Sequence, residues 1–271
     1  MKPMPSASAI AAEVLSALDN SRQIAPFSAR DPQFDIDTAY AATAKLREAR
    51  QARGEKQIGR KIGFTNRNIW PQYGIDRPIW GDMWDTTLRE ISMDGPAISL
   101  AGFSQPQIEP EIAFKLAAAP RPGMDETALL GCVEWVTQGF ELVQSIYPNW
   151  KFTVADTIAA GGLHGTLLLG ARVSPARIPD AMRALTDFEV MLLRNGEIAD
   201  RGRGANVLGS PLLALRHLVE LLTTDPHNPP LHAGEIVTTG TLTRAIPVVP
   251  GEIWTTQLSG IGLPGLSVTF G

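Results

Sequence analysis

The chain has 271 residues, a formal net charge of −4 and hydrophobic residues at 44% of its positions. This length is sufficient for a large buried core, and the mild acidity gives no electrostatic reason to propose nucleic-acid binding, which depends on a clustered basic surface. Cys132 is the single cysteine, which excludes an intramolecular disulfide framework and a cysteine-based structural zinc site.

The N-terminal 55 residues are predicted to be helical. Residues 6–19 carry apolar residues at the spacing of an amphipathic helix, and a second helix is predicted over residues 39–52, with Asp37 as its N-cap. Neither segment has the apolar core of a signal peptide, and no run of about 18 apolar residues predicts a transmembrane helix. We therefore expect a cytoplasmic protein without a membrane or nucleic-acid partner.

From residue 58 onward, short apolar runs separated by glycine and proline predict β-strands. The predicted strands cover residues 98–100, 108–116, 140–146, 167–169, 188–193, 236–239, 253–258 and 266–270. One helix is predicted over residues 211–222, with Ser210 as N-cap and Pro211 in its first turn. The expected fold class is α+β: a helical portion, residues 1–55, and a β-rich body, residues 56–271, in one structural unit.

The most informative strand covers residues 107–116, where apolar residues alternate with polar ones. Glu109 and Glu111 therefore project from one face, with their side chains roughly 7 Å apart at the base. Two carboxylates at this separation repel each other unless a positive charge lies between them, and oxygen donors favour a hard cation such as Mg²⁺ or Mn²⁺. A solvent-facing strand that carries two acids has the same pattern, and the spacing does not decide between them.

Two further charged residues lie in apolar surroundings. Glu141 lies within a mostly apolar run, where an acid needs a partner; either a metal ion or a buried arginine would serve. Lys61 begins a short apolar run that ends in a turn with Gly63. Taken alone, Lys61 is better explained as an ordinary surface lysine.

Five segments occur in an order and at separations that resemble the 2-keto-4-pentenoate hydratase and 4-oxalocrotonate decarboxylase family, within the fumarylacetoacetate hydrolase superfamily. They are residues 60–65, 108–114, 140–145, 209–212 and 234–243. The resemblance covers nearly the whole chain from about Ala39 to Phe270, and its most specific motif is the Glu-Pro-Glu strand.

The resemblance implies a β-roll body of the fumarylacetoacetate hydrolase type with an α-helical N-terminal portion, and assembly into a homo-oligomer. It implies that Lys61 is the catalytic lysine, which transfers a proton. It also implies a Mg²⁺ or Mn²⁺ ion held by Glu109, Glu111 and Glu141, and a substrate pocket that includes Thr239, Gly240 and Thr241.

These residues suit the chemistry of a 2-oxo acid, whose carboxylate and keto oxygens can chelate one hard cation. The cation stabilises the enolate that forms when a proton or carbon substituent leaves, and a nearby lysine can move the proton. We expect a lyase acting on a short unsaturated 2-oxo acid, as in aromatic ring-cleavage pathways, either a hydratase or a decarboxylase. A C–C hydrolase or keto–enol tautomerase would use the same metal. A catalytically idle partner subunit is a third hypothesis, although it would not need three uncompensated carboxylates.

The sequence departs from the family at two places. Ile79 stands where these enzymes usually carry an acid, and Asp82, shifted along the chain, is a candidate substitute. Residues 161–163 replace small hydroxyl residues, and His164 follows them between glycines. His164 is a candidate general acid or base, or a carboxylate-binding residue, although it would equally fit a local turn. Lys151 and Asp156 are weaker candidates for the pocket.

Overall fold

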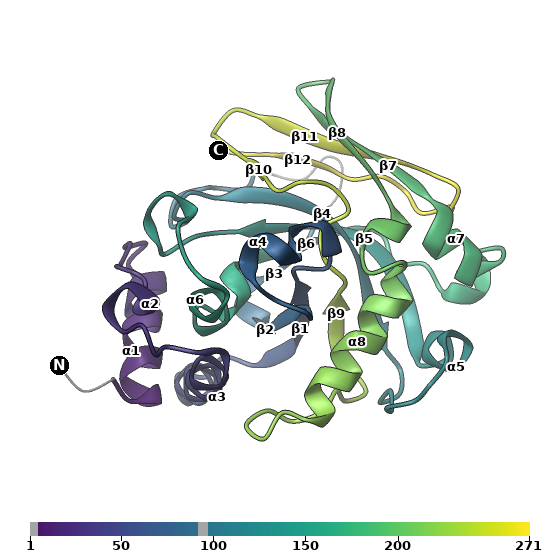
Figure 1. Ribbon diagram of the computed structural model, residues 1–271. Helices are drawn as coiled ribbons and strands as arrows, with labels where there is room; N and C mark the ends of the chain where they lie inside the picture. Colours follow the sequence, from purple (N-terminus) through teal and green to yellow (C-terminus); the bar gives the residue numbers. More distant parts are fainter. Residues whose placement is uncertain (1–4, 92–96) are drawn as a thin grey trace.

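The computed structural model describes residues 5–91 and 97–271, and it contains two β-sheets flanked by helices (Figure 1). The larger sheet has eight strands in the order β2-β1-β9-β4-β5-β6-β3, and β10 pairs with β4. Its strands are β1 Gln57–Gly63, β2 Ile79–Trp84, β3 Leu88–Glu90, β4 Gln107–Leu116, β5 Val133–Val143, β6 His164–Leu169, β9 Ile236–Thr238 and β10 Ile246–Pro247.

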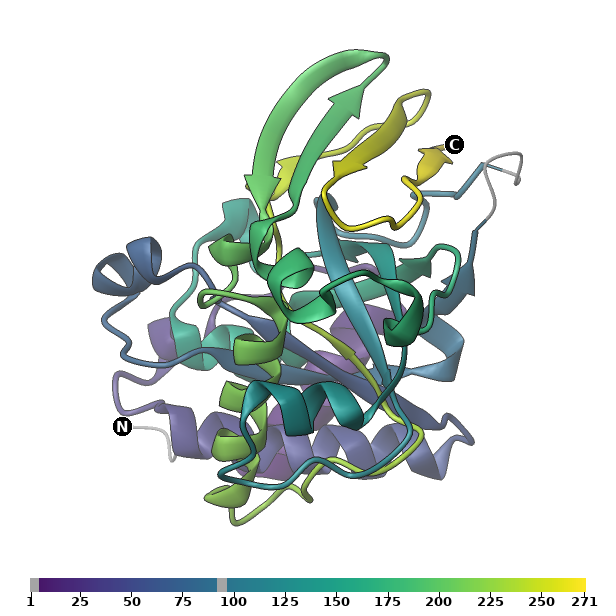
Figure 2. The same ribbon diagram turned by 90° about the vertical axis from the view of Figure 1, so that its right-hand side faces the viewer.

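The smaller sheet has the order β12-β11-β7-β8 and is antiparallel throughout. Its strands are β7 Glu189–Arg194, β8 Glu197–Arg203, β11 Ile253–Ser259 and β12 Ser267–Thr269. Figure 2 shows the β7–β8 hairpin projecting from the body. Apolar residues of both sheets share one buried cluster, in which Phe140 and Leu168 meet Trp254. This burial of apolar surface holds the two sheets together.

The N-terminal helices are α1 Ala7–Asp19, α2 Phe27–Arg30 and α3 Ile36–Ala52, and their apolar faces pack with α6, Val154–Ala159, in a second cluster. Ser6 caps α1 through a bond from the Ala9 N–H. The predicted cap of the next helix is wrong: Asp35, not Asp37, accepts from the Thr38 N–H at 2.9 Å, so α3 starts earlier. The division into residues 1–55 and 56–271 stays a prediction, and residues 1–4 lie outside the described part.

The helix predicted over residues 211–222 is confirmed as α8, Pro211–Thr223, and Ser210 caps it by accepting from the Leu213 N–H. Its buried leucines pack against Ile112 and Phe114, which lie on the even-numbered face of β4. The odd-numbered face of β4, which carries Glu109 and Glu111, therefore lies on the other side of the sheet from α8. The remaining helices are α4 Trp70–Tyr73, α5 Glu126–Gly131 and α7 Ala181–Asp187. None of the described helices is both long and apolar enough to cross a membrane.

The predicted strands are mostly present, with different bounds. Ile98 makes only a single bridge with Phe270, so the strand predicted at residues 98–100 is wrong. The strand predicted at residues 140–146 is β5, which begins at Val133 and ends at Val143. Most of β5 is buried on both faces, and it therefore lacks the alternation by which a half-exposed strand is recognised.

Candidate functional site

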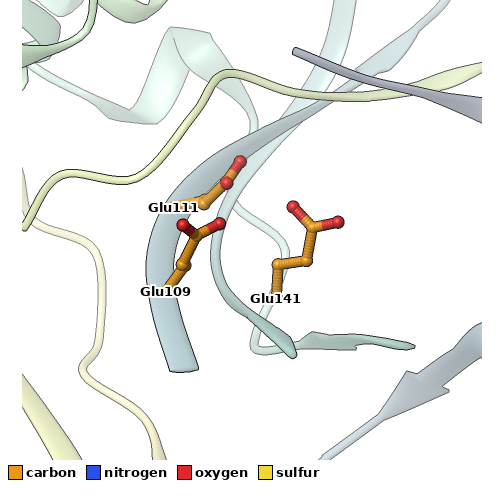
Figure 3. A group of neighbouring side chains, drawn as sticks. All are labelled: Glu109, Glu111 and Glu141. Atoms are coloured by element: carbon orange, nitrogen blue, oxygen red, sulfur yellow. The ribbon is translucent and has the colours of Figure 1, made fainter. Parts of the chain in front are cut away.

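The three predicted acids converge because β4 and β5 are antiparallel neighbours. Glu109 is the direct cross-strand partner of Glu141, and Glu111 lies two residues further along β4. Side chains of directly paired residues share a face of the sheet, so all three acids project together. Each offers a carboxylate oxygen, and these atoms lie within 4.8 Å of one another. Figure 3 shows the three carboxyl groups turned toward a common space.

Pro110 lies between two of the acids in an interior strand, where a proline is unusual. Its carbonyl accepts from the Leu242 N–H at 2.9 Å. The amide nitrogen of Pro110 points to the same side as its carbonyl. On that side β4 pairs with β9 only at residues 113–115, so Pro110 lies outside this pairing. The missing N–H therefore removes no bond from that pairing, which explains how the Glu-Pro-Glu sequence fits in the centre of the sheet.

Glu111 is buried, and only one of its oxygens is satisfied. Its Oε2 accepts from the Gly240 N–H at 2.8 Å, whereas Oε1 has no hydrogen-bond partner among the described residues. A buried carboxylate oxygen without a partner is costly, and a cation would satisfy it. Gly240 has φ +93°, and a side chain there would overlap Thr65. Glycine is therefore required for the close approach that brings this N–H to Glu111.

Lys61 lies on the same face of the sheet as the acids. It pairs with Thr238, which pairs with Ala113 of β4, two residues from Glu111. Its Nζ atom lies 3.0 Å from Oε2 of Glu141, and both side chains are buried. Burial alone would lower the pKa of Lys61, but the three carboxylates outweigh it and hold that pKa above its usual range. Lys61 is therefore a buried cation paired with the acidic cluster.

His164 contacts the other oxygen of Glu141. Its Nδ1 lies 2.7 Å from Oε1 of Glu141, and its Nε2 lies 2.8 Å from Oγ1 of Thr87. An ionised carboxylate can only accept, so Nδ1 carries the proton in this contact. The ring is therefore held between Glu141 and Thr87 and orients the carboxylate. His164 is thus a partner of Glu141 in the structure, and its predicted role as a general acid or base, or as the residue that binds a substrate carboxylate, stays a prediction.

The three carboxyl groups differ in how readily they ionise. Burial raises the pKa of Glu109 to about 7, an effect that Lys61 reduces and Glu141 increases. Burial and then Glu141 hold the pKa of Glu111 well above its usual range. Burial also opposes ionisation of Glu141, but Lys61 and His164 outweigh it, and the pKa of Glu141 is lowered. In the absence of another cation, Glu141 is the acid that most readily carries a negative charge.

The cluster opens into a cavity of about 490 Å³, which is lined by Lys61 and Glu109 among other residues. Thr241, from the predicted pocket segment, also lines it. Gly240 contacts Glu111 instead, and the Thr239 hydroxyl donates to the Ile112 carbonyl. Part of the cavity lining is aromatic and aliphatic. The polar part includes Asp200, Arg201, Asn206, Thr241, Thr243 and Arg244.

Asp82 does not belong to the site. It pairs with Arg60, the neighbour of Lys61 on β1, and successive residues of a strand face opposite sides. Asp82 therefore lies on the far face of the sheet, where it accepts from Arg47 at 3.0 Å and from Gln57 at 2.7 Å. Its prediction as a catalytic residue is wrong because its face depends on strand register, which the sequence does not give.

Lys151 and Asp156 are also not brought to the cavity. Lys151 is exposed and is not among the residues that line it. Asp156 is buried and accepts from the Thr153 and Ser28 N–H groups, so it caps α6 and ties α2 to it. Thr87 and Arg201 were not predicted, because no local pattern marks either residue.

Comparisons with known proteins identify the family to which the sequence is similar. The model of the fumarylacetoacetate (FAA) hydrolase C-terminal family matches residues 85–265. The chain is 31% identical over 257 residues to the 2-hydroxyhexa-2,4-dienoate hydratase of Comamonas testosteroni, covering 93% of this chain and 94% of the relative. It is 30% identical over 234 residues to the 4-oxalocrotonate decarboxylase of Pseudomonas putida, covering 85% and 84%.

A solved structure, the 4-oxalocrotonate decarboxylase from Pseudomonas putida G7 complexed with magnesium and adipate, is similar over 97% of both chains. The TM-score is 0.88 and the identity 28%. These similarities confirm the resemblance predicted from the sequence. They also confirm the α+β fold with a β-rich body of the fumarylacetoacetate hydrolase type.

Proposed function

The chain belongs to the fumarylacetoacetate hydrolase superfamily, in the group of 2-keto-4-pentenoate hydratases and 4-oxalocrotonate decarboxylases, and from this premise we propose that it is a divalent-metal-dependent lyase acting on a small unsaturated 2-oxo acid. The observation that carries the proposal is the convergence of three carboxylates and a buried lysine at one cavity.

The donors present fit a divalent cation. All three are carboxylate oxygens, the type that Mg²⁺ and Mn²⁺ prefer, and Oε1 of Glu111 is buried without a hydrogen-bond partner in the described structure. The charges also fit: three ionised carboxylates are balanced by one divalent cation together with Lys61. We propose Glu109, Glu111 and Glu141 as the ligands and Mg²⁺ or Mn²⁺ as the ion.

A divalent cation at these acids supplies Lewis-acid stabilisation of negative charge on a substrate oxygen. The residues of the chain perform the rest. Lys61 lines the cavity and holds a proton at Nζ, which it can donate to the substrate; the neutral amine that remains can then accept a proton. Glu141 fixes the Lys61 ammonium by the 3.0 Å contact, and His164 fixes Glu141 in turn. The position of the Lys61 ammonium therefore depends on Glu141, which is also a proposed ligand of the metal ion.

The alternatives considered from the sequence are not favoured. The relatives with the identities given above are named hydratases and a decarboxylase. A fumarylpyruvate hydrolase from Pseudomonas aeruginosa shares the fold at a TM-score of 0.58 but only 12% identity, which supports no shared activity. An idle partner subunit would have no physical reason to retain three carboxylates, two of them buried, around a buried lysine. We also propose a cytoplasmic homo-oligomer that acts in aromatic catabolism.

The test is turnover by the purified chain with Mg²⁺ on two substrates, 2-hydroxypenta-2,4-dienoate and 2-oxo-3-hexenedioate. Loss of the dienoate absorbance without release of carbon dioxide would identify a hydratase. Release of carbon dioxide from the hexenedioate would identify a decarboxylase. Turnover of neither substrate, with Mg²⁺ bound, would contradict the proposed lyase and favour a hydrolase or tautomerase.

A further inference from the structure

The cavity is larger than the smallest substrate of the proposed kind requires. Its volume is about 490 Å³. A five-carbon 2-oxo acid has about eight non-hydrogen atoms, and it would occupy at most roughly 240 Å³ if each atom took the about 30 Å³ share of a water molecule in the liquid. About half of the cavity therefore remains beyond such a substrate. The lining of that remaining space indicates what else the substrate carries.

One wall of the cavity is apolar, and we call it the aromatic wall. Its principal side chains are Phe64, Tyr73, Ile79, Trp150, Phe152 and Leu163. The Phe64 and Tyr73 rings pack edge to face, with centroids 4.7 Å apart, and the Trp150 and Phe152 centroids are 6.1 Å apart. The indole N–H of Trp150 already donates to the Gln105 carbonyl. What Trp150 offers to the cavity is therefore mainly its ring.

The aromatic wall begins at Lys61. A methyl group on Gly162 would lie 3.2 Å from Cδ of Lys61, and Leu163 follows directly. A methyl group on Gly63 would lie 3.2 Å from Cγ1 of Ile79 and 4.0 Å from Cε of Lys61. A substrate whose keto acid end lies at Lys61 and Glu109 would therefore extend along apolar side chains.

The backbone of this wall is strained. Phe64 has φ 57°, Trp150 has φ 57° and Leu163 has φ 62°. Bulky side chains avoid this region, and such conformations persist where the surrounding structure imposes them, which is often at ligand-binding sites. Three strained residues thus present large apolar side chains to the same cavity. This is a second indication, independent of composition, that the wall is a recognition surface.

Besides Lys61, the cavity lining carries two arginines, Arg201 and Arg244. Arg244 is paired with Asp200 at 2.9 Å, while Arg201 is exposed and makes no ion pair among the described residues. A second carboxylate on the substrate would have to reach Arg201 to be compensated, because on the aromatic wall it would be desolvated without a partner. The aromatic wall therefore favours an uncharged extension of the substrate.

Building on the proposed function, we propose that the natural substrate is a 2-oxo acid with a bulky apolar extension, such as an aryl or long alkyl group, that packs on the aromatic wall. The keto acid end lies at the acidic cluster and Lys61. The extension has about as many atoms as that end, since the cavity holds about twice the volume of the five-carbon acid. A dicarboxylic 2-oxo acid held by Arg201 is the competing outcome.

The test is binding of three saturated 2-oxo acids to the full-length protein in excess Mg²⁺, measured by titration calorimetry. Pyruvate probes the keto acid end alone, 4-phenyl-2-oxobutanoate adds an aryl group, and 2-oxoadipate adds a second carboxylate. We expect the phenyl compound to bind at least roughly tenfold tighter than pyruvate, because it buries additional apolar surface. The 2-oxoadipate should gain no comparable advantage.

Variants show which part of the cavity lining is responsible for any gain in affinity. Trp150→Ala and Phe152→Ala should each reduce the advantage of the phenyl compound while pyruvate affinity stays the same, which also shows that the variants remain folded. Arg201→Gln is the matched control in the polar part of the lining and should leave the affinity for the phenyl compound unchanged. Tighter binding of 2-oxoadipate that Arg201→Gln abolishes would overturn the proposal in favour of a diacid. Equal affinities for all three acids would overturn it as well. If the wild-type protein bound no pyruvate even in excess Mg²⁺, this would instead contradict the proposed function itself.

Discussion

Oε2 of Glu141 lies 3.0 Å from Nζ of Lys61, and Oε1 of the same carboxylate lies 2.7 Å from the His164 ring. Glu141 thus connects three groups: Lys61, which is the proposed proton-transfer residue, His164, which does not line the cavity, and the proposed metal site. Changes in any of these residues should affect the others in ways that separate their roles.

Lys61→Met should abolish most turnover. The variant keeps an unbranched apolar side chain but removes the proton that Lys61 holds, and proton transfer of this kind contributes about 10²–10⁴-fold to the rate. Steady-state rates with saturating Mg²⁺ measure this loss. A variant that retains more than about a tenth of the wild-type rate would contradict the assignment of Lys61.

Lys61→Met should also destabilise the metal-free protein, because Glu141 is then buried without its cation. Removing one partner of a buried ion pair costs about 3–5 kcal/mol. Urea unfolding in EDTA measures this cost, and excess Mg²⁺ should offset part of it. An unchanged free energy of unfolding in EDTA would show that the contact between Lys61 and Glu141 contributes little.

His164→Ala should weaken Mg²⁺ binding without abolishing it. His164 orients the Glu141 carboxylate, and loss of such an outer contact typically costs about 10–100-fold in metal affinity. Titration calorimetry with Mg²⁺ measures the change, and Thr87→Val, which removes the next bond along, should have a smaller effect. A large loss of kcat with unchanged Mg²⁺ affinity would favour the direct catalytic role predicted from the sequence.

The stability of the metal-free protein should fall as pH rises from 5 to 8. Burial raises the pKa of Glu109 from 4.5 to about 7, so the folded state binds the proton more tightly than the unfolded state. The stability that this proton contributes is fully present below the unfolded pKa and is lost as pH rises through about 7. Urea unfolding in EDTA across this range measures the slope. Glu109→Gln should reduce the slope, with the remainder due to Glu111, whose pKa burial also raises. A slope unchanged by that substitution would exclude Glu109 as a source.

Asp82→Asn should lower stability but leave the metal site intact. It weakens the buried contacts with Arg47 and Arg60 on the far face of the sheet, and breaking such a pair costs about 3–5 kcal/mol. Thermal unfolding and Mg²⁺ titration together measure the two effects. Arg47→Met, in the same network, is the matched control. A loss of Mg²⁺ affinity in either variant would show that the two faces are coupled.

Much of the site could be predicted because its signal is local. Alternation along β4 places Glu109 and Glu111 on one face whatever the strand pairs with. Glu141 is different: its place opposite Glu109 depends on the β4–β5 register, which only the resemblance to a family supplied. The fold class followed in the same way from helical spacing before residue 55 and short strands after it.

The errors have physical causes. Asp82 was misplaced because the sequence gives neither the pairing with Arg60 nor the face that follows from it. Asp156 had a local signal that points elsewhere: Thr153 and Asp156 form a capping box at the start of α6, a pattern that marks a helix terminus. His164 lies next to the site as expected, but which group it contacts depends on the β5–β6 pairing.

The central claim is that Glu109, Glu111 and Glu141 share one divalent cation. The most direct test is Mg²⁺ titration calorimetry of Glu111→Gln beside the wild type, since Gly240 and the neighbouring strands would hold a glutamine in the same place. We expect affinity to fall by at least roughly 100-fold, because one ligand charge is lost. Glu134→Gln, an exposed acid on the same strand as Glu141, should bind Mg²⁺ as the wild type does. Equal Mg²⁺ affinity of Glu111→Gln and the wild type would contradict the shared metal site.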